Sequence, residues 1–137
     1  MTNSENMTST ISSPHLNNVS KTILAKASKI KLALFDVDGV LTDGRIYIGN
    51  NGEEHKDFHT QDGLGLKLLQ KTGVAVGLIT SRQSAAVTIR AEQLGIKHIY
   101  QGQAEKESAY EALLSKLQCS DEEVAYTGDD LPDLRLI

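Results

Sequence analysis

The sequence predicts an α/β fold in which a doubly wound parallel sheet carries helices on both faces. Short, mostly apolar runs recur along the chain between turn residues, as is typical of strands buried on both sides. Segments with apolar residues at helical spacing separate these runs, and such alternation is the pattern of parallel sheets. The aromatic content of 4% also favours an aliphatic α/β core over an all-β one.

The composition excludes several classes of protein. The chain has 137 residues, enough for one domain with a core, and its formal net charge of −4 argues against nucleic acid or a membrane surface as a partner. Cys119 is the single cysteine, which excludes an intrachain disulfide and a thiolate zinc site. The chain has no apolar run of membrane-spanning length and no signal-peptide pattern, so we expect a cytoplasmic protein.

The N-terminal part of the chain is expected to lie outside the folded domain. Residues 1–18 are rich in Ser, Thr and Asn with few apolar side chains, too few to offset the entropy of ordering, and we expect a disordered tail. Residues 19–137 are expected to form the domain. Apolar residues at helical spacing predict a short helix over residues 19–28.

The first strand, predicted over residues 31–35, ends at Asp36 and is followed by a small insertion. Within residues 45–59 an Asn51-Gly52 pair lies between two β-prone runs, which is a strong signal for a hairpin. A hairpin at this point would act as a flap over the end of the first strand. Its apolar residues should pack on another part of the protein or on another subunit.

The remaining elements follow from apolar spacing and capping residues. Asp62 is expected to cap a helix over residues 64–71, with Leu64, Leu68 and Leu69 on its buried face. The later elements are a strand over 74–79, a helix that buries Val87, Ala91 and Leu94 and ends at Gly95, a strand over 97–100, a helix over 105–117, a helical turn opening at Ser120, and a strand over 124–127.

Polar side chains stand where several of these elements begin or end. The carboxyl ends of parallel strands meet at one edge of a sheet, so we expect these side chains to lie together. Two carboxylates as close as Asp36 and Asp38 repel each other unless a cation lies between them, and oxygen ligands suit Mg²⁺. Each feature alone is common in turns and on helix surfaces. The full set is Asp36, Asp38, Thr80, Lys106, Asp129, Asp130 and Asp133.

In this order the residues resemble the four motifs of the haloacid dehalogenase-like phosphohydrolases. Those motifs are an Asp-x-Asp strand end, a strand-end Thr or Ser, a Lys, and a Gly-Asp-Asp-x-x-Asp loop. The resemblance runs from about Ile30 onward and implies a Rossmannoid sheet with a hairpin flap and no large cap domain. Further segments resemble the branch that hydrolyses 3-deoxy-D-manno-octulosonate 8-phosphate in lipopolysaccharide precursor biosynthesis, namely 36–44, 49–53, 62–65, 101–103 and 128–133.

The resemblance implies a role for each motif residue. Asp36 would attack phosphorus and form an aspartyl phosphate, and Asp38 would serve as general acid and then general base. Thr80 and Lys106 would bind the phosphoryl oxygens as charge develops on them. Mg²⁺ would be bound by Asp36, by Asp129 and by the backbone carbonyl of Asp38. Asp130 and Asp133 would orient the metal ligands and Lys106.

The family's substrate positions and its quaternary structure can be carried over in the same way. Arg82 and Arg90 would clamp the carboxylate of a phosphorylated sugar acid through two hydrogen bonds each. Lys67 stands where several relatives would have Arg, so the exact sugar is left open. The resemblance also implies a homotetramer whose neighbouring chains close the site. The matching substrate positions are His59, Thr60, Gln61, Asp62, Gly63, Lys67, Arg82 and Arg90.

Three alternatives remain open from the sequence. The first is a phosphatase acting on a related nonulosonate 9-phosphate. The second is a phospho-accepting receiver domain, which would carry its phosphorylated Asp after a later strand, whereas the 74–79 strand ends in Thr80. The third is a catalytically weakened or non-enzymatic fold. The family pattern continues past Ile137 with a helix, a strand and a tail, so we expect a truncated domain with 124–127 as an unprotected edge strand. His55 and His98 lack metal-ligand spacing and are expected at the surface.

Overall fold

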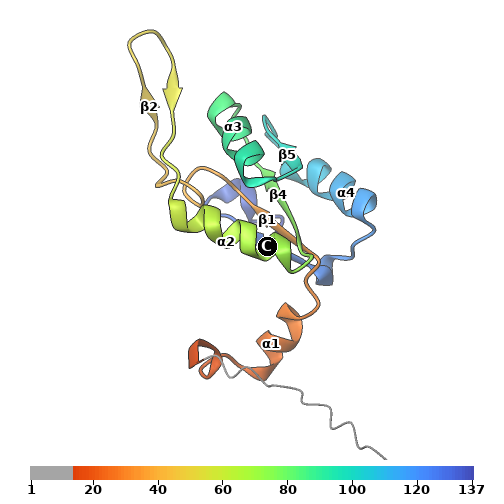
Figure 1. The fold of residues 1–137 in the computed structure, drawn as a ribbon. Helices are drawn as coiled ribbons and strands as arrows, with labels where there is room; N and C mark the ends of the chain where they lie inside the picture. Colours follow the sequence, from red (N-terminus) through yellow and green to blue (C-terminus); the bar gives the residue numbers. More distant parts are fainter. Residues whose placement is uncertain (1–13) are drawn as a thin grey trace, which may run out of the picture.

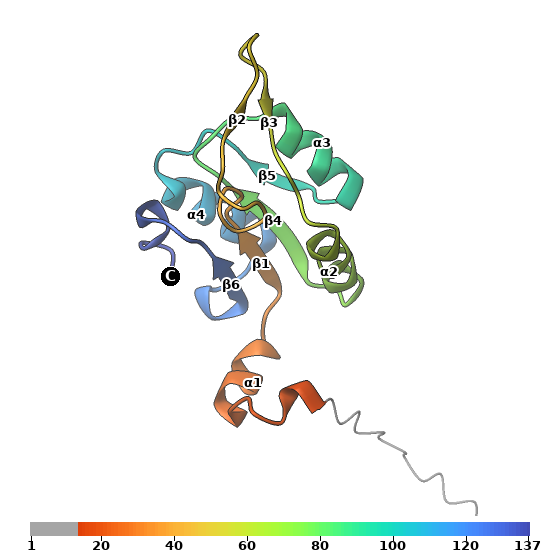
Figure 2. The same cartoon turned by 90° about the vertical axis from the view of Figure 1, so that its left-hand side faces the viewer.

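The computed structural model describes residues 14–137, so residues 1–13 of the tail predicted for residues 1–18 lie outside this part of the chain. Pro14–Leu16 form a 3₁₀ turn (η1), followed by helix α1 (Lys21–Ala27). The Ser20 hydroxyl caps α1 by accepting a hydrogen bond from the Ile23 amide at 3.2 Å. No residue of α1 is buried, and two views at right angles place it below the body of the protein (Figures 1 and 2).

A four-stranded parallel sheet forms the centre of the protein, in the order β5-β4-β1-β6. Helices α2 and α3 lie on one side of the sheet and α4 on the other (Figure 2). The predicted doubly wound arrangement is therefore confirmed. The bounds are β1 (Leu32–Phe35), α2 (Thr60–Lys71), β4 (Ala75–Ile79), α3 (Ala85–Leu94), β5 (His98–Tyr100), α4 (Lys106–Leu117), η2 (Asp121–Glu123), β6 (Val124–Thr127) and η3 (Leu131–Asp133).

The core has two parts because successive side chains of a strand point to opposite faces of the sheet. Leu32 and Leu34 of β1 are fully buried against Leu113 of α4 on one face. On the other face, Val76 and Leu78 of β4 pack in one cluster with residues of α2 and α3. With helices on both faces, β1 and β4 are buried on both sides, which explains their nearly continuous apolar sequences.

The predicted hairpin is formed by β2 (Tyr47–Ile48) and β3 (Glu54–His55), which pair antiparallel. Its turn uses Gly52 at φ +83°, a backbone conformation that side chains disfavour. The hairpin projects well beyond the sheet in both views (Figures 1 and 2). The side chains of Ile46 and Ile48 are exposed along it, so within one chain the hairpin has little to pack against.

Helix α2 differs from its prediction in both its cap and its buried face. It begins at Thr60, because Nδ1 of His59 accepts a hydrogen bond from the Gln61 amide at 3.1 Å, and Asp62 therefore lies in the first turn and is not the cap. The buried side chain of α2 is Leu66, while Leu64 and Leu68 are 60% and 51% exposed. Leu66 packs in the core and Leu69 packs against it, so of the three predicted residues only Leu69 lies on the buried side of the helix.

The two outer strands of the sheet, β6 and β5, bear on the predictions for residues 124–127 and for His98. β6 pairs with β1 alone and is the outer strand of the sheet within residues 14–137. His98 on β5 was expected at the surface, but it is partly buried and its Nδ1 atom has no hydrogen-bond partner. Across residues 14–137, no helix has the length and apolar character needed to cross a bilayer.

Candidate active site

The ends of three neighbouring strands bring the predicted residues together. In the parallel register Phe35 of β1 is level with Leu78 of β4 and Thr127 of β6. The next residue, Asp36, donates its amide to the Thr127 carbonyl at 2.9 Å, so the first loop starts beside the loop that carries Asp129. A pocket of about 260 Å³ opens there, lined by Asp36, Asp38, Gly44, Thr80, Ser81, Arg82, Lys106, Asp129, Asp130, Pro132 and Asp133.

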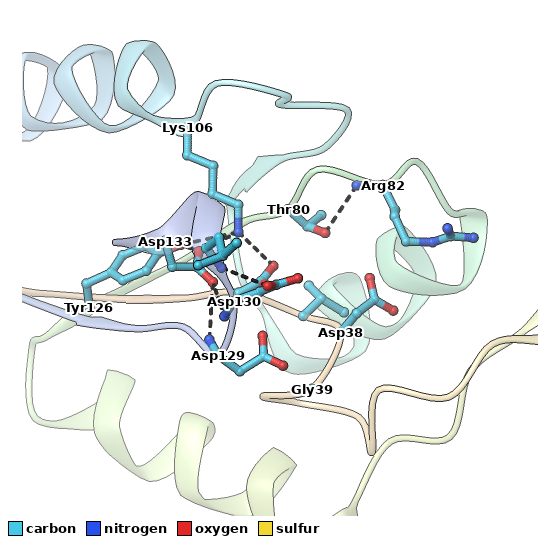
Figure 3. Close-up of polar contacts among 12 residues, drawn as sticks. Asp38, Gly39, Thr80, Arg82, Lys106, Tyr126, Asp129, Asp130 and Asp133 are labelled. Carbon is cyan, nitrogen blue, oxygen red and sulfur yellow. Dashed lines mark hydrogen bonds and ion pairs between the residues drawn. The ribbon is translucent and has the colours of Figure 1, made fainter. Parts of the chain in front are cut away.

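Lys106 is the buried cation of this pocket. It starts helix α4, its side chain is 2% exposed, and its ammonium lies 2.6 Å from Oδ1 of Asp133 and 3.1 Å from Oδ1 of Asp36. A buried ammonium is stable only when it is paired, and two carboxylates pair it here. Figure 3 shows the Lys106 side chain extended toward this group of carboxylates. Lys106 therefore links α4 to the loops that follow β1 and β6.

Asp133 is fully buried and fully engaged by hydrogen bonds. Its Oδ1 accepts from Lys106 and from the Tyr126 hydroxyl at 2.5 Å, and its Oδ2 accepts from the amides of Asp129 and Asp130 at 3.1 and 3.2 Å. These four bonds use the acceptor capacity of a carboxylate. Asp130 caps η3 by accepting from the Leu131 amide at 2.7 Å. Asp133 thus holds the loop of Asp129 in place.

The ionisation of the buried groups reflects this pairing. Burial raises the pKa of Asp36, an effect that outweighs the lowering by its Val37 and Lys106 hydrogen bonds. Burial also acts on Asp133, but hydrogen bonds from Lys106 and Tyr126 bring its pKa below the ordinary value. Burial and the bond to Asp133 raise the pKa of Tyr126. Of the two carboxylates, Asp36 is thus the one whose charge burial disfavours more, in spite of its contact with Lys106.

Three carboxylates could surround a cation in this pocket. Oxygen atoms of Asp36, Asp129 and Asp133 all lie within 4.8 Å of one another. Because the Asp133 oxygens are already engaged, Asp36 and Asp129 are the better ligands. Gly39, at φ +86°, is required beside them, since a Cβ built there would overlap the Asp129 carboxylate. The donors are all hard oxygens, which fits Mg²⁺ better than a nitrogen- or sulfur-preferring metal.

The base of the hairpin contributes two residues that the sequence analysis did not identify. The ammonium of Lys56, just after β3, contacts Oδ1 of Asp38 and lies 2.9 Å from Oε1 of Glu54. Oε2 of Glu54 in turn accepts from Arg82 at 2.5 Å. The side chains of Glu54 and Lys56 are two residues apart and so share one side of the strand, a signal that the alternating pattern could have provided.

Thr80 follows β4 and is almost completely buried, with its hydroxyl in the pocket. Its backbone is fixed by two hydrogen bonds, from its amide to the Tyr100 carbonyl at 2.9 Å and from the Gln103 amide to its own carbonyl at 3.0 Å. The hydroxyl accepts only a long bond from the Arg82 amide, at 3.4 Å (Figure 3). It therefore retains a proton to donate to a ligand.

Of the eight predicted substrate positions, the pocket is lined by Arg82 alone. His59, Gln61 and Asp62 line a separate pocket of about 490 Å³ beside Phe58. The others, Thr60, Gly63, Lys67 and Arg90, do not line the pocket of Asp36 and Lys106. Thr60 and Lys67 are exposed. Gly63 is buried beside the guanidinium of Arg90, which lies 6.0 Å from the centroid of the Phe58 ring. Within one chain the predicted substrate site is thus divided between two places.

Comparison with known proteins shows which proteins this chain is similar to. No protein-family model matches the chain. The curated 3-deoxy-D-manno-octulosonate 8-phosphate phosphatase of Escherichia coli (strain K12) is 50% identical over 115 residues, which are 84% of this chain and 61% of the relative. The chain therefore spans less than two thirds of the length of that curated relative.

Two crystal structures have the same fold. The 3-deoxy-D-manno-octulosonate 8-phosphate phosphatase of Yersinia pestis is 47% identical, with a TM-score of 0.84 over 86% of this chain and 64% of that one. The enzyme of that name from Moraxella catarrhalis, in complex with a magnesium ion, a phosphate ion and a KDO molecule, is 49% identical, with a TM-score of 0.81 over 83% of this chain and 66% of that one.

Proposed function

Because this chain belongs to the 3-deoxy-D-manno-octulosonate 8-phosphate phosphatase family of haloacid dehalogenase-like proteins, we propose that it is a Mg²⁺-dependent phosphatase of that sugar-acid phosphate. The observation that carries the proposal is the grouping of Asp36, Asp129 and Asp133. The buried Lys106 pairs with two of these carboxylates, Asp36 and Asp133, and Thr80 lines the same pocket. A phosphoryl group needs a nucleophile, fixed positive charge and hydroxyl donors, and this pocket offers all three.

In the first step of the proposed reaction, a carboxylate oxygen of Asp36 attacks phosphorus and an aspartyl phosphate forms. The bond from phosphorus to the sugar oxygen breaks, its electron pair stays on that oxygen, and Asp38 supplies the proton that makes it a hydroxyl. In the second step Asp38 takes a proton from water, the water oxygen bonds to phosphorus, and the bond to Asp36 breaks. The products are the free sugar acid and inorganic phosphate.

Fixed positive charge is what lets a carboxylate approach a phosphate dianion. Lys106 supplies one charge and is held in place by Asp133. A magnesium ion held by Asp36 and Asp129, with the Asp38 backbone carbonyl as a further ligand, would add charge next to the transferred group. The raised pKa of Asp36 supports this assignment, because the carboxylate lacks full compensation from the side chains alone.

We also propose that neighbouring chains complete the substrate site in a homotetramer. Two observations support an assembly: the exposed Leu64 and Leu68 on α2, and the exposed Ile46 and Ile48 on the hairpin. In such an assembly the positions from His59 to Gly63, with Lys67 and Arg90, would face the pocket of another chain while Arg82 serves its own. A cytoplasmic role in lipopolysaccharide precursor biosynthesis belongs to the same proposal.

The deciding experiment measures phosphate release from a panel of esters after chelation and again after Mg²⁺ is added. The panel contains 3-deoxy-D-manno-octulosonate 8-phosphate, a nonulosonate 9-phosphate and p-nitrophenyl phosphate. We expect Mg²⁺-dependent release, with the highest kcat/KM for the first ester. Full activity after chelation would overturn the metal assignment, and a preference for the nonulosonate ester would overturn the substrate assignment.

Arg82 provides a separate test of the carboxylate clamp. Removing it in Arg82→Ala should lower kcat/KM for the sugar-acid phosphate by about 10- to 100-fold, the size of a lost charge-assisted bidentate contact. The loss for p-nitrophenyl phosphate, which has no carboxylate, should be much smaller. Equal losses for both esters would show that Arg82 serves the phosphate or the hairpin contact with Glu54 instead.

A further inference from the structure

Lys56 is a buried charged residue for which the proposed reaction has no role. Its side chain is 2% exposed, although it belongs to a hairpin that otherwise lies in solvent. Its side-chain nitrogen contacts Oδ1 of Asp38 and lies 2.9 Å from Oε1 of Glu54, so two carboxylates face it. An ammonium is held inside a protein only where carboxylates compensate it, and Asp38 is one of the two that do so here.

These contacts continue into a row of alternating charges. Asp38 pairs with Lys56, Lys56 with Glu54, and Glu54 with Arg82. The row joins the loop after β1, the end of the hairpin and the loop after β4. Asp38 and Lys56 are 18 residues apart along the chain, and Glu54 and Arg82 are 28 residues apart. The Glu54 carboxylate is held by both cations, and their hydrogen bonds lower its pKa. The hairpin is therefore fixed to the pocket through charged side chains at its base.

Lys56 also determines how the Asp38 carboxylate is oriented. Among residues 14–137, Lys56 is the only side chain that bonds this carboxylate, and it takes Oδ1. The other oxygen is then the one free to meet the leaving group. Figure 3 shows the Asp38 carboxylate set apart from the group formed by Lys106, Asp129 and Asp133, so none of those residues orients it. Without Lys56 the side chain could rotate about both of its torsions.

We propose that Lys56 is a positioning residue that fixes the Asp38 carboxylate toward the leaving-group oxygen, and that the hairpin thereby takes part in the reaction of its own chain. This inference rests on the proposed phosphatase function. Lys56 itself does not touch the reacting atoms. A misplacement of about 1 Å in a proton donor can cost on the order of 100-fold in rate, so its effect should be measurable.

The test compares two esters that differ in their need for an acid. The sugar alkoxide of 3-deoxy-D-manno-octulosonate 8-phosphate must be protonated as it leaves, whereas p-nitrophenolate is stable as an anion. In Lys56→Met we expect kcat/KM to fall about 10- to 100-fold for the sugar ester, within the range of general acid catalysis. For p-nitrophenyl phosphate we expect a loss below about threefold, because that ester needs little acid. Lys56→Arg should recover most of the sugar-ester activity. Lys71→Met, a matched change at an exposed lysine, should leave both values unchanged.

A double-mutant cycle separates positioning from a general effect. If Lys56 acts through Asp38, then Lys56→Met should cause no further loss in an Asp38→Asn background. Equal losses on the two esters in the single variant, or additive losses in the cycle, would overturn the proposal. If the unmodified protein released phosphate from neither ester, the proposed function would fall, and hydrogen exchange would then decide the contact. Faster exchange of hairpin amides in both Lys56→Met and Asp38→Asn supports it, and unchanged exchange overturns it.

Discussion

The hydroxyl of Tyr126 lies 2.5 Å from Oδ1 of Asp133 and donates to it, while Oδ2 of the same carboxylate holds the loop that carries Asp129. This hydroxyl comes from inside β6, so the last strand of the sheet supports the candidate metal ligand through one buried carboxylate. Lys106 shares the acceptor oxygen with Tyr126. The position of Lys106 and that of the loop with the candidate metal ligand Asp129 are thus coupled.

Removing this hydroxyl in Tyr126→Phe should destabilise the protein by about 1 kcal/mol, the usual net value of a hydrogen bond, or somewhat more because its acceptor is charged. It should also lower kcat several-fold, because Asp133 then holds Lys106 and the Asp129 loop less firmly. Tyr110→Phe is the matched control, since it removes a 2.8 Å bond to Asp121 at an exposed site. We expect it to affect the unfolding midpoint alone. A similar loss of kcat in both variants would contradict the coupling.

The nucleophile is tested by Asp36→Asn. An amide keeps the shape of the side chain but is a poor nucleophile and a weaker metal ligand, so phosphate release should fall by at least about 10³-fold, or roughly 4 kcal/mol of activation free energy. Burial disfavours the charge of Asp36, and Lys106 keeps its shorter contact with Asp133 when that charge is removed, so the thermal midpoint should change little. Asp43→Asn, at an exposed carboxylate, should retain full activity. Substantial turnover by the Asp36 variant would exclude an aspartyl-phosphate intermediate.

The need for glycine beside the candidate metal site can be measured with two matched substitutions. Gly39 and Gly52 have nearly the same positive φ, +86° and +83°, so an alanine at either strains the backbone by about 1–2 kcal/mol. Around Gly52 there is open space, whereas a Cβ at Gly39 would overlap the Asp129 carboxylate. Gly39→Ala should therefore raise the Mg²⁺ concentration for half-maximal activity about tenfold or more, a displacement effect of the kind seen when metal ligands are disturbed. Gly52→Ala should leave it unchanged. Equal Mg²⁺ requirements in the two variants would contradict the assignment of Asp129.

The elements of the fold follow from local patterns, which is why they could be predicted. Apolar runs gave the buried strands, and the stripe of Val87, Ala91 and Leu94 gave the orientation of α3, as the structure confirms. The predicted face of α2 was wrong for Leu64 and Leu68, which are exposed, and correct for Leu69, which packs against the core. The helix has apolar residues on two sides, and only the packing decides that Leu66 is the buried one. Local patterns therefore fail where a helix offers two apolar faces.

In the candidate site, too, some contacts could be predicted from the sequence and others could not. Asp36, Thr80, Lys106 and Asp129 could be predicted to meet because each stands at the end of a parallel strand or the start of a helix. The contact between Lys56 and Asp38 joins residues 18 positions apart and depends on where the hairpin folds back. No short-range sequence pattern predicts such a contact. The ion pairs at the base of the hairpin could therefore be found only from the structure.

The last prediction concerns His98 and the dependence of stability on pH. Burial lowers the pKa of His98, with the nearby Lys116 and Lys97 adding to the effect, and its Nδ1 has no hydrogen-bond partner. The unfolded chain, where a histidine has its ordinary pKa of about 6.5, therefore binds a proton more readily than the folded protein does. The contribution of His98 to the free energy of unfolding therefore has its full value above about pH 6.5, where His98 is neutral in both states. It decreases as the pH falls from there through the folded-state pKa of His98.

The experiment compares denaturation midpoints in urea at pH 7.5 and pH 5.5. The decrease between these two values should be smaller in His98→Gln than in the unmodified protein, because glutamine cannot take up the proton. His55→Gln is the control, since His55 lies on the exposed hairpin with its side chain 70% accessible to solvent. It should retain the full decrease. If the His98 variant and the unmodified protein lost the same stability on acidification, the penalty for a charge at His98 would be negligible and carboxylate pairs elsewhere would account for the change.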